Sequence, residues 1–189
     1  VIFDEANTVE DVAGEHFGLQ VSEAGVRYLL RHLYDTRRGR GLLSVHGSSA
    51  NPAIEDVVEL TARTEGFFER VIRWQEQSGR CNARVQEANI IENDVTPKLR
   101  DLSLPLHALL ARLAPDAEIS ELSSQADKVT AMAATIEAII THSLPDAVYW
   151  IDISGSTPKR VSLHAAPVNV AAGLRTHLFE KVKSVVMTS

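Results

Sequence analysis

Apolar residues in the middle of the chain recur every three or four positions, which is the spacing of one face of an α-helix. The pattern predicts long helices over about 52–78, 96–113 and 118–143, and a shorter helix after Ser22. Ser22 is a good helix cap, and proline at position 52 suits the first turn of the next helix. We therefore expect helix to pack on helix through most of the chain. The apolar stripe of the shorter helix is Val26, Leu29, Leu30 and Leu33.

Glycine and proline residues interrupt this pattern. Gly66 weakens the middle of the first long helix by about 1 kcal/mol relative to alanine, which leaves room for a bend or break. Pro105 removes a backbone donor and predicts a kink in the second. Residues 36–51 are rich in glycine and have little apolar pattern, so a mobile loop is expected there. Residues 83–91 fit either a strand or an irregular link.

The two ends of the chain have strand patterns. Residues 1–3 predict a buried strand, and alternating residues over 148–153 and 161–165 predict a hairpin around a Ser-Gly turn. A helix over about 168–182 and a strand over 184–187 are expected to close the chain. Both termini fall inside predicted strands, whereas domain borders usually lie in polar linkers, so we expect an internal piece of a longer protein.

Charge and composition narrow the classes of function. The formal net charge of −6 argues against a broad nucleic-acid-binding surface, so any DNA contact must be local. The single cysteine, Cys81, excludes a disulfide framework and cannot alone hold zinc or an iron-sulfur cluster. A passive thiol in a reducing cytoplasm is expected. No apolar run approaches the roughly 18 residues that a membrane span needs, so no membrane partner is expected.

Two carboxylates directly follow the first predicted strand. P-loop motors use this arrangement because a rigid strand end holds one acid to orient Mg²⁺ and a second to position or deprotonate the attacking water. Asp4 and Glu5 would take these catalytic and metal-binding roles. The alternative is an ordinary helix start, where acidic residues interact favourably with the helix dipole.

Other candidate residues are weighed against structural roles. Arg37, Arg38 and Arg40 form the densest basic cluster, which indicates either phosphate contact or a solvated loop. Trp74 and Trp150 could stack on bases, but core positions are favoured for both. The histidines show no metal-ligand spacing, so no zinc site is expected.

The motifs at both ends resemble those of one helicase family. The segment Val1-Ile2-Phe3-Asp4-Glu5-Ala6-Asn7 resembles motif II of superfamily 2 helicases, and Ser184-Val185-Val186-Met187-Thr188-Ser189 resembles the strand leading into motif III. The segments 147–151, 159–167 and 174–179 are similar, in the same order, to DinG-type (XPD-like) ATP-dependent DNA helicases.

This resemblance implies a mainly α fold with a small α/β part. Residues 1–20 and 145–189 would belong to the first RecA-like P-loop motor domain, and 21–144 would form a helical arch of three or four long helices that guides single-stranded DNA. The strands at residues 1–4 and 184–188 would then be parallel neighbours. Thr188 and Ser189 would belong to motif III.

The resemblance also implies cofactors and partners. The intact protein would use ATP and Mg²⁺, act on single-stranded and forked DNA together with the remaining helicase domains, and work in the bacterial cytoplasm at the nucleoid. An iron-sulfur cluster in the parent stays open, because its ligands would lie upstream. The family usually has His where this chain has Asn7, which puts the coupling role of that position in doubt.

Two other classes of function stay open. A helical adaptor or scaffold without catalysis would carry helicase-like ends by chance. A stand-alone metal-dependent phosphohydrolase would use Asp4 and Glu5, but it would need further ligands close in space.

Overall fold

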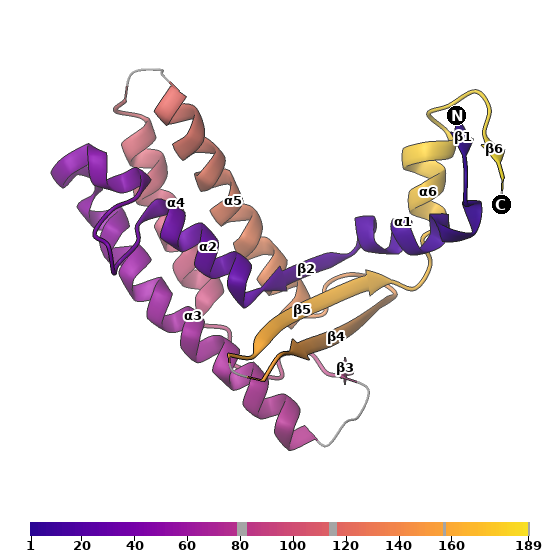
Figure 1. Cartoon of the computed structure of the whole chain (residues 1–189), viewed down its shortest axis with the longest axis horizontal. Helices are drawn as coiled ribbons and strands as arrows, with labels where there is room; N and C mark the ends of the chain where they lie inside the picture. The colour runs from indigo at the N-terminus through magenta and orange to yellow at the C-terminus, as the bar shows by residue number, and fades with distance from the viewer. Residues whose placement is uncertain (79–82, 114–116, 157, 189) are drawn as a thin grey trace.

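The computed structural model describes residues 1–78, 83–113, 117–156 and 158–188. Its elements, in chain order, are β1 (Ile2–Phe3), η1 (Ala6–Thr8), α1 (Val9–Phe17), β2 (Leu19–Ser22), α2 (Glu23–Leu33), η2 (Leu42–Ala50), α3 (Asn51–Ser78), β3 (Arg84–Val85), α4 (Val95–Leu110), α5 (Ala117–Ile140), β4 (Ala147–Ser154), β5 (Arg160–Pro167), α6 (Ala171–Leu174), η3 (Arg175–Phe179) and β6 (Val186–Met187). Figure 1 shows α2, α3, α4 and α5 gathered at one side of the molecule, with both termini together at the other.

The helical part follows the predicted pattern closely. All four residues of the stripe predicted for α2 are buried, and the Ser22 hydroxyl accepts a 3.1 Å hydrogen bond from the amide of Gly25. The first long helix, α3, runs through Gly66 as one helix, since the packing of neighbouring Phe67 and Phe68 outweighs the local cost of glycine. Helix α4 continues through Pro105 to Leu110.

The loop predicted over residues 36–51 was wrong for most of its length. A tight turn leads into the 3-10 segment η2, in which Leu43 and Ala50 are completely buried. Gly41 lies so close to the preceding helix that a Cβ there would stand 2.5 Å from the carbonyl oxygen of Leu33. Gly41 therefore permits close packing, and Gly39 and Gly47 adopt positive φ; the sequence pattern could not distinguish these roles from those of glycines in an irregular loop.

The predicted hairpin is confirmed and belongs to a four-stranded antiparallel sheet with strand order β2-β5-β4-β3. Side chains alternate between its faces. Tyr149, Ile151 and Leu163 point to the inner face and join one apolar core with the helices. Residues 147–167 therefore pack against the helices and share their core. The resemblance would instead assign these residues to the motor domain.

The terminal segments form a second, smaller group. Strand β1 pairs in parallel with β6, with Ile2 opposite Val186 and Phe3 opposite Met187, as predicted. The prediction that these strands are buried was wrong: Ile2 is 74% and Val186 52% exposed, because among the described residues no other strand or helix covers the two-stranded pair. The helix expected over 168–182 is shorter than predicted: α6 covers Ala171–Leu174 and continues as a π-helical turn to Phe179. Figure 1 shows these elements beside α1, beyond the end of the sheet.

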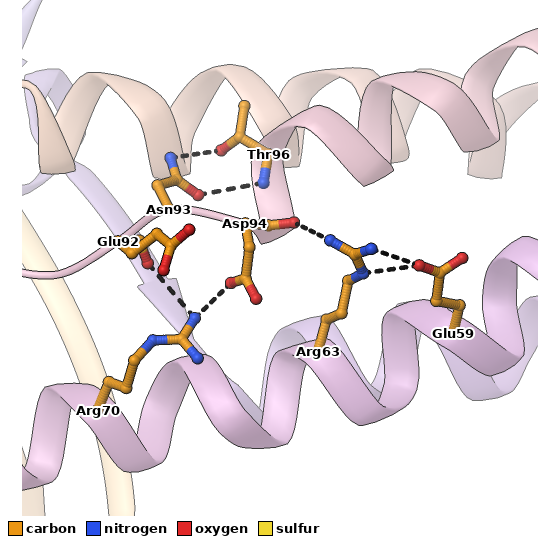
Figure 2. Close-up of polar contacts among 7 residues, drawn as sticks. All are labelled: Glu59, Arg63, Arg70, Glu92, Asn93, Asp94 and Thr96. Carbon is orange, nitrogen blue, oxygen red and sulfur yellow. Dashed lines mark hydrogen bonds and ion pairs between the residues drawn. The ribbon is translucent and has the colours of Figure 1, made fainter.

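Charged and polar side chains fasten α3 to the start of α4 (Figure 2). Arg63 donates to the backbone oxygen of Asp94 at 3.4 Å, and Arg70 pairs with the Asp94 carboxylate. Asn93 caps α4, because its side-chain oxygen accepts a 3.1 Å hydrogen bond from the amide of Thr96. These contacts fix the segment that follows β3 against the middle of α3.

One further cation lies between the two helices. Lys98 of α4 contacts the carboxylates of Asp56 and Glu59 at 2.8 Å each, and only 18% of its side chain is exposed. Hydrogen bonds to Asp56 and then Glu59 raise the pKa of Lys98 well above its usual value. The two carboxylates therefore favour the charged form of this lysine.

Among the described residues, none of the helices has the length and apolar character that crossing a membrane requires.

The α4 helix offers a matched test of this packing. Leu102 is completely buried, whereas Leu104 on the same helix is 69% exposed. We expect Leu102→Ala to lower the free energy of unfolding by about 2–5 kcal/mol, because it removes core contacts and leaves a cavity. Leu104→Ala should change it by no more than about 0.5 kcal/mol. Urea denaturation followed by circular dichroism measures both, and equal losses would contradict this packing of α4.

Candidate functional site

The first candidate site lies where β1 and β6 end side by side. The amide of Thr188 donates to the backbone oxygen of Phe3 at 2.9 Å, and the amide of Ala6 donates back to the oxygen of Thr188 at 2.9 Å. The Thr188 hydroxyl also donates to the Asp4 carboxylate at 2.9 Å. The predicted motif II and motif III residues thus form direct hydrogen bonds, although 184 positions separate Asp4 from Thr188. Ser189 lies outside the described residues.

A left-handed backbone at Glu5 turns the chain sharply after the strand. Glu5 has φ 54° and ψ 48°, a conformation that costs non-glycine residues energy and is often found at functional sites. With its side-chain nitrogen turned toward this residue, Asn7 donates to the backbone oxygen of Glu5 at 3.2 Å and to its carboxylate at 3.3 Å. Asn7 therefore holds the second carboxylate of the pair.

Asp4 and Glu5 have the chemistry of a partial magnesium site. Both side chains are exposed at a strand end, and one Asp4 oxygen accepts from Thr188 and from the amide of Glu5 at 3.1 Å. Mg²⁺ commonly binds one or two carboxylates and completes its shell with water and phosphate oxygens, so this donor set fits. In the described ranges, no group of three or more His, Cys, Asp or Glu side chains could hold a metal ion without such help.

The second candidate site is the turn that carries Arg37, Arg38 and Arg40. Asp35 organises it: its carboxylate accepts from the amides of Arg37 at 2.9 Å and Arg38 at 3.1 Å, and its backbone pairs with that of Arg40. An aspartate that begins a turn in this way is a recognised sequence signal, which our sequence reasoning missed.

The turn presents its arginine side chains to solvent. All three are exposed, and in the part of the chain that the structure describes neither Arg37 nor Arg40 forms a side-chain ion pair. On the neighbouring helix Tyr28 is 71% exposed, which the sequence did not single out. Most helix arginines are instead paired, such as Arg63 with Glu59. An acidic chain therefore still has a local cluster of exposed arginines at this turn.

The two candidate sites are far apart. Figure 1 shows the turn between α2 and η2 on the outer side of the helices, whereas β1 and β6 lie at the opposite end of the molecule. No single ligand of small size contacts both.

The remaining candidates have mixed outcomes. Trp74 packs partly buried against the core, as expected. Trp150 was wrongly assigned to the core: it lies on the outer face of the sheet, because register places its neighbours Tyr149 and Ile151 inward. The ring of His142 stacks on Tyr149 and the ring of His164 stacks on Trp150. Cys81 lies outside the described residues.

No protein-family model matches the chain, and a comparison with curated proteins finds no match. Function must therefore be argued from the residues and their geometry.

The titration of Asp35 provides a test of the arginine turn. Partial burial by itself raises the pKa of Asp35, but hydrogen bonds from the amides of Arg38 and Arg37 and attraction to arginine side chains outweigh it and lower the pKa below the ordinary 3.8. The unfolded chain then binds the proton more tightly than the folded chain. The ionised Asp35 carboxylate therefore stabilises the folded chain. This contribution is complete above the ordinary pKa of aspartate and is lost as the pH falls through the lowered pKa of Asp35.

We expect an NMR titration to find the Asp35 carboxyl pKa below 3.8 and to find it raised in Arg38→Ala. Arg160→Ala, on the distant β5 strand, is the control and should leave it unchanged. An Asp35 pKa at or above its ordinary value would contradict the geometry of this turn.

Proposed function

We propose that this chain is part of a DinG-type ATP-dependent DNA helicase, in which ATP hydrolysis is coupled to single-strand translocation and unwinding. Residues 1–20 and 145–189 would belong to the motor domain, and residues 21–144 would form an arch over the DNA path. This proposal rests on one observation above all: the two motif-like segments pair as parallel strands and join Asp4 to Thr188.

The pairing of β1 with β6 supports the proposal because the resemblance to helicases predicts it, whereas the sequence pattern of each strand alone does not. Two strands separated by nearly the whole chain become neighbours only if the intervening residues return to their starting point. A chance match of two short motifs gives no reason for Asp4 of one and Thr188 of the other to share a hydrogen bond. The helical content and length of the intervening part also fit an arch.

The residues at this edge suit the roles that the resemblance implies. Bound Mg-ATP would supply the phosphoryl group and the metal ion. Asp4, oriented by the Thr188 hydroxyl, would contact the ion or its waters, and Glu5, held by Asn7, would orient or deprotonate the attacking water. The hydrogen bond between Asp4 and Thr188 gives motif III a direct route by which to respond to the state of the nucleotide site.

The arginine turn suits a local contact with DNA phosphates. Its exposed guanidinium groups supply local positive charge on a chain whose net charge is −6. A strand-guiding arch needs only such a lining, so the net charge of −6 is compatible with the proposal.

The two alternative functions, a scaffold and a stand-alone phosphohydrolase, predict different structural features. A scaffold protein explains the helices but not the hydrogen bond from Thr188 to Asp4. A stand-alone phosphohydrolase would need more metal ligands near Asp4 and Glu5 than the described residues supply. The sequence of the parent gene distinguishes these alternatives from the helicase. A GxGKT-like loop upstream and Ala-Thr after Ser189 would support the helicase.

Activity tests the proposed motor site. The 189 residues contain no GxxxxGK[ST] phosphate loop, so we expect this chain to show no ATP hydrolysis above background, with or without single-stranded DNA. In the intact parent, Asp4→Asn should lower the rate of ATP hydrolysis about 100-fold or more, because the ion loses a charged ligand. Glu180→Gln, an exposed change in the same terminal group, is the control.

A phosphate-release assay on both proteins measures these rates. Turnover by the 189-residue chain that Asp4→Asn abolishes would favour the stand-alone hydrolase. An unaffected rate in the Asp4→Asn parent would remove the motor assignment.

Salt dependence tests the arginine turn. If Arg37 and Arg38 neutralise phosphates, each should contribute about 0.7 to the slope of log affinity against log salt for single-stranded DNA. In the parent, Arg37→Glu with Arg38→Glu should therefore flatten the slope and slow unwinding, while ATP hydrolysis without DNA stays nearly unchanged. Fluorescence anisotropy at several salt concentrations gives the slope.

The matched control is Arg73→Glu on α3, whose side chain is also well exposed but pairs with Glu69. An unchanged slope in the double variant would remove the turn from the DNA path and leave the motor assignment standing.

A further inference from the structure

The outer face of the sheet carries a row of four side chains that do not belong to the core. Register places Arg84 beside Trp150, Trp150 beside His164, and His164 beside Gln20, one residue from each strand. Directly opposite residues in antiparallel strands project from the same face at close spacing. The row therefore crosses the whole sheet on the face opposite the core that the sheet shares with α2 to α5.

Two of these side chains form a stacked aromatic pair. The rings of Trp150 and His164 have centroids 4.9 Å apart and planes only 6° from parallel. The His164 ring is held from one side by a 2.9 Å hydrogen bond between its Nε2 and the hydroxyl of Ser162. Burial lowers the pKa of His164, with Asp152 opposing the shift, so the ring is neutral near pH 7 and stacks as an uncharged aromatic.

A hollow opens beside this pair. It has a volume of about 840 Å³ and lies between α1 and the outer face of β5, with Glu10 and Gly14 on the helix side and Gln20 beside the rings. This volume lies within the range of about 300–1,000 Å³ that is usual for small-molecule sites. No lysine or arginine lines it among the described residues, and Glu10 contributes a carboxylate.

We propose that this hollow is a stacking site for an unpaired base of single-stranded DNA, with the base extending the Trp150–His164 pair. A flat π-surface attracts aromatic rings of any base. Arg84 stands at the other end of the row, beyond Trp150, and does not line the hollow, whereas Glu10 does. This lining disfavours a phosphate, so the sugar-phosphate chain would stay outside. The choice of DNA as the source of the base rests on the proposed function, whereas the stacking surface does not.

The polar groups at the hollow favour bases with an amino group. The carboxylate of Glu10 only accepts hydrogen bonds, and the amide of Gln20 both accepts and donates. Cytosine presents an amino donor of the kind that carboxylates read in protein–DNA complexes. Oligo(dC) is therefore the probe of choice.

Tryptophan fluorescence gives a direct test. The chain has two tryptophans, so Trp74→Phe leaves Trp150 as the sole reporter. We expect oligo(dC) to quench its emission in this 189-residue variant, an abasic strand of equal length to leave it unchanged, and dCMP to quench only at much higher concentration. Equal quenching by the abasic strand, or none by oligo(dC), would overturn the proposal. Quenching by dCMP at the same concentration as oligo(dC) would overturn DNA as the occupant.

Variants of the hollow make the test independent of the reporter. His164→Ala, which removes the ring at the hollow end of the stacked pair, should weaken oligo(dC) binding, measured by anisotropy, about 5- to 150-fold, which corresponds to one base–aromatic stack. Gly14→Leu should weaken it similarly, because a Cβ at Gly14 meets nothing within 4 Å and a larger side chain would extend into the hollow. Val12→Leu, 61% exposed on the same helix and outside the hollow, is the matched control.

Circular dichroism shows whether each variant is folded. Unchanged affinity in a folded Gly14→Leu chain would overturn the stacking site. That failure is distinct from failure of the proposed function, because Asp4-dependent ATP hydrolysis is measured in the parent without DNA and does not involve the sheet.

Discussion

Burial of apolar side chains between the inner face of the four-stranded sheet and helices α2 to α5 determines where the rest of the molecule lies. The chain enters this core through β2 and leaves it through β5, and these strands pair with Leu19 opposite Ala165. Because the entry and exit strands are antiparallel neighbours, the segments before and after them begin side by side. This arrangement brings the terminal segments near each other and so allows β1 to pair with β6 at the far end of the molecule.

The same packing explains how a long helical insertion is compatible with a site built from its two ends. The entropic cost of closing a loop rises only slowly with its length, and a folded insertion with adjacent ends avoids most of that cost. Asp4 and Thr188 can therefore meet although they are separated by almost the entire chain. The helices are free to extend far from the site without disturbing it.

Positively charged side chains between helices have carboxylate partners, whereas those on the exposed turn after α2 are mostly solvated. Cations that face neighbouring helices are matched with carboxylates, such as Lys98 with Asp56, because a partly buried charge without a partner is costly. Arginines on the turn after α2 carry no such constraint, since they are solvated. An acidic protein can thus keep a basic surface at one place, where it is available to a polyanion.

The sequence by itself determined much of the helical part and identified the acidic residues of the first candidate site. Helix spacing and caps identified α2 to α5, and the alternation in the hairpin identified β4 and β5, because these signals depend on neighbours within one element. The carboxylates at the first strand were also found locally. The prediction of a mobile loop over residues 36–51 was wrong. A glycine that allows close packing, such as Gly41, cannot be told from a glycine in a mobile loop by the sequence alone.

Only the tertiary structure decided which residues meet. The apolar run around Trp150 predicts a core position for this residue. The strand register, which places Trp150 opposite His164, instead puts it on the outer face of the sheet. Asn7 and Thr188 acquire partners solely because the chain turns at Glu5 and because β6 returns beside β1. Local patterns report the period of an element, but the face that an element buries and the strand beside it depend on contacts between residues far apart in sequence.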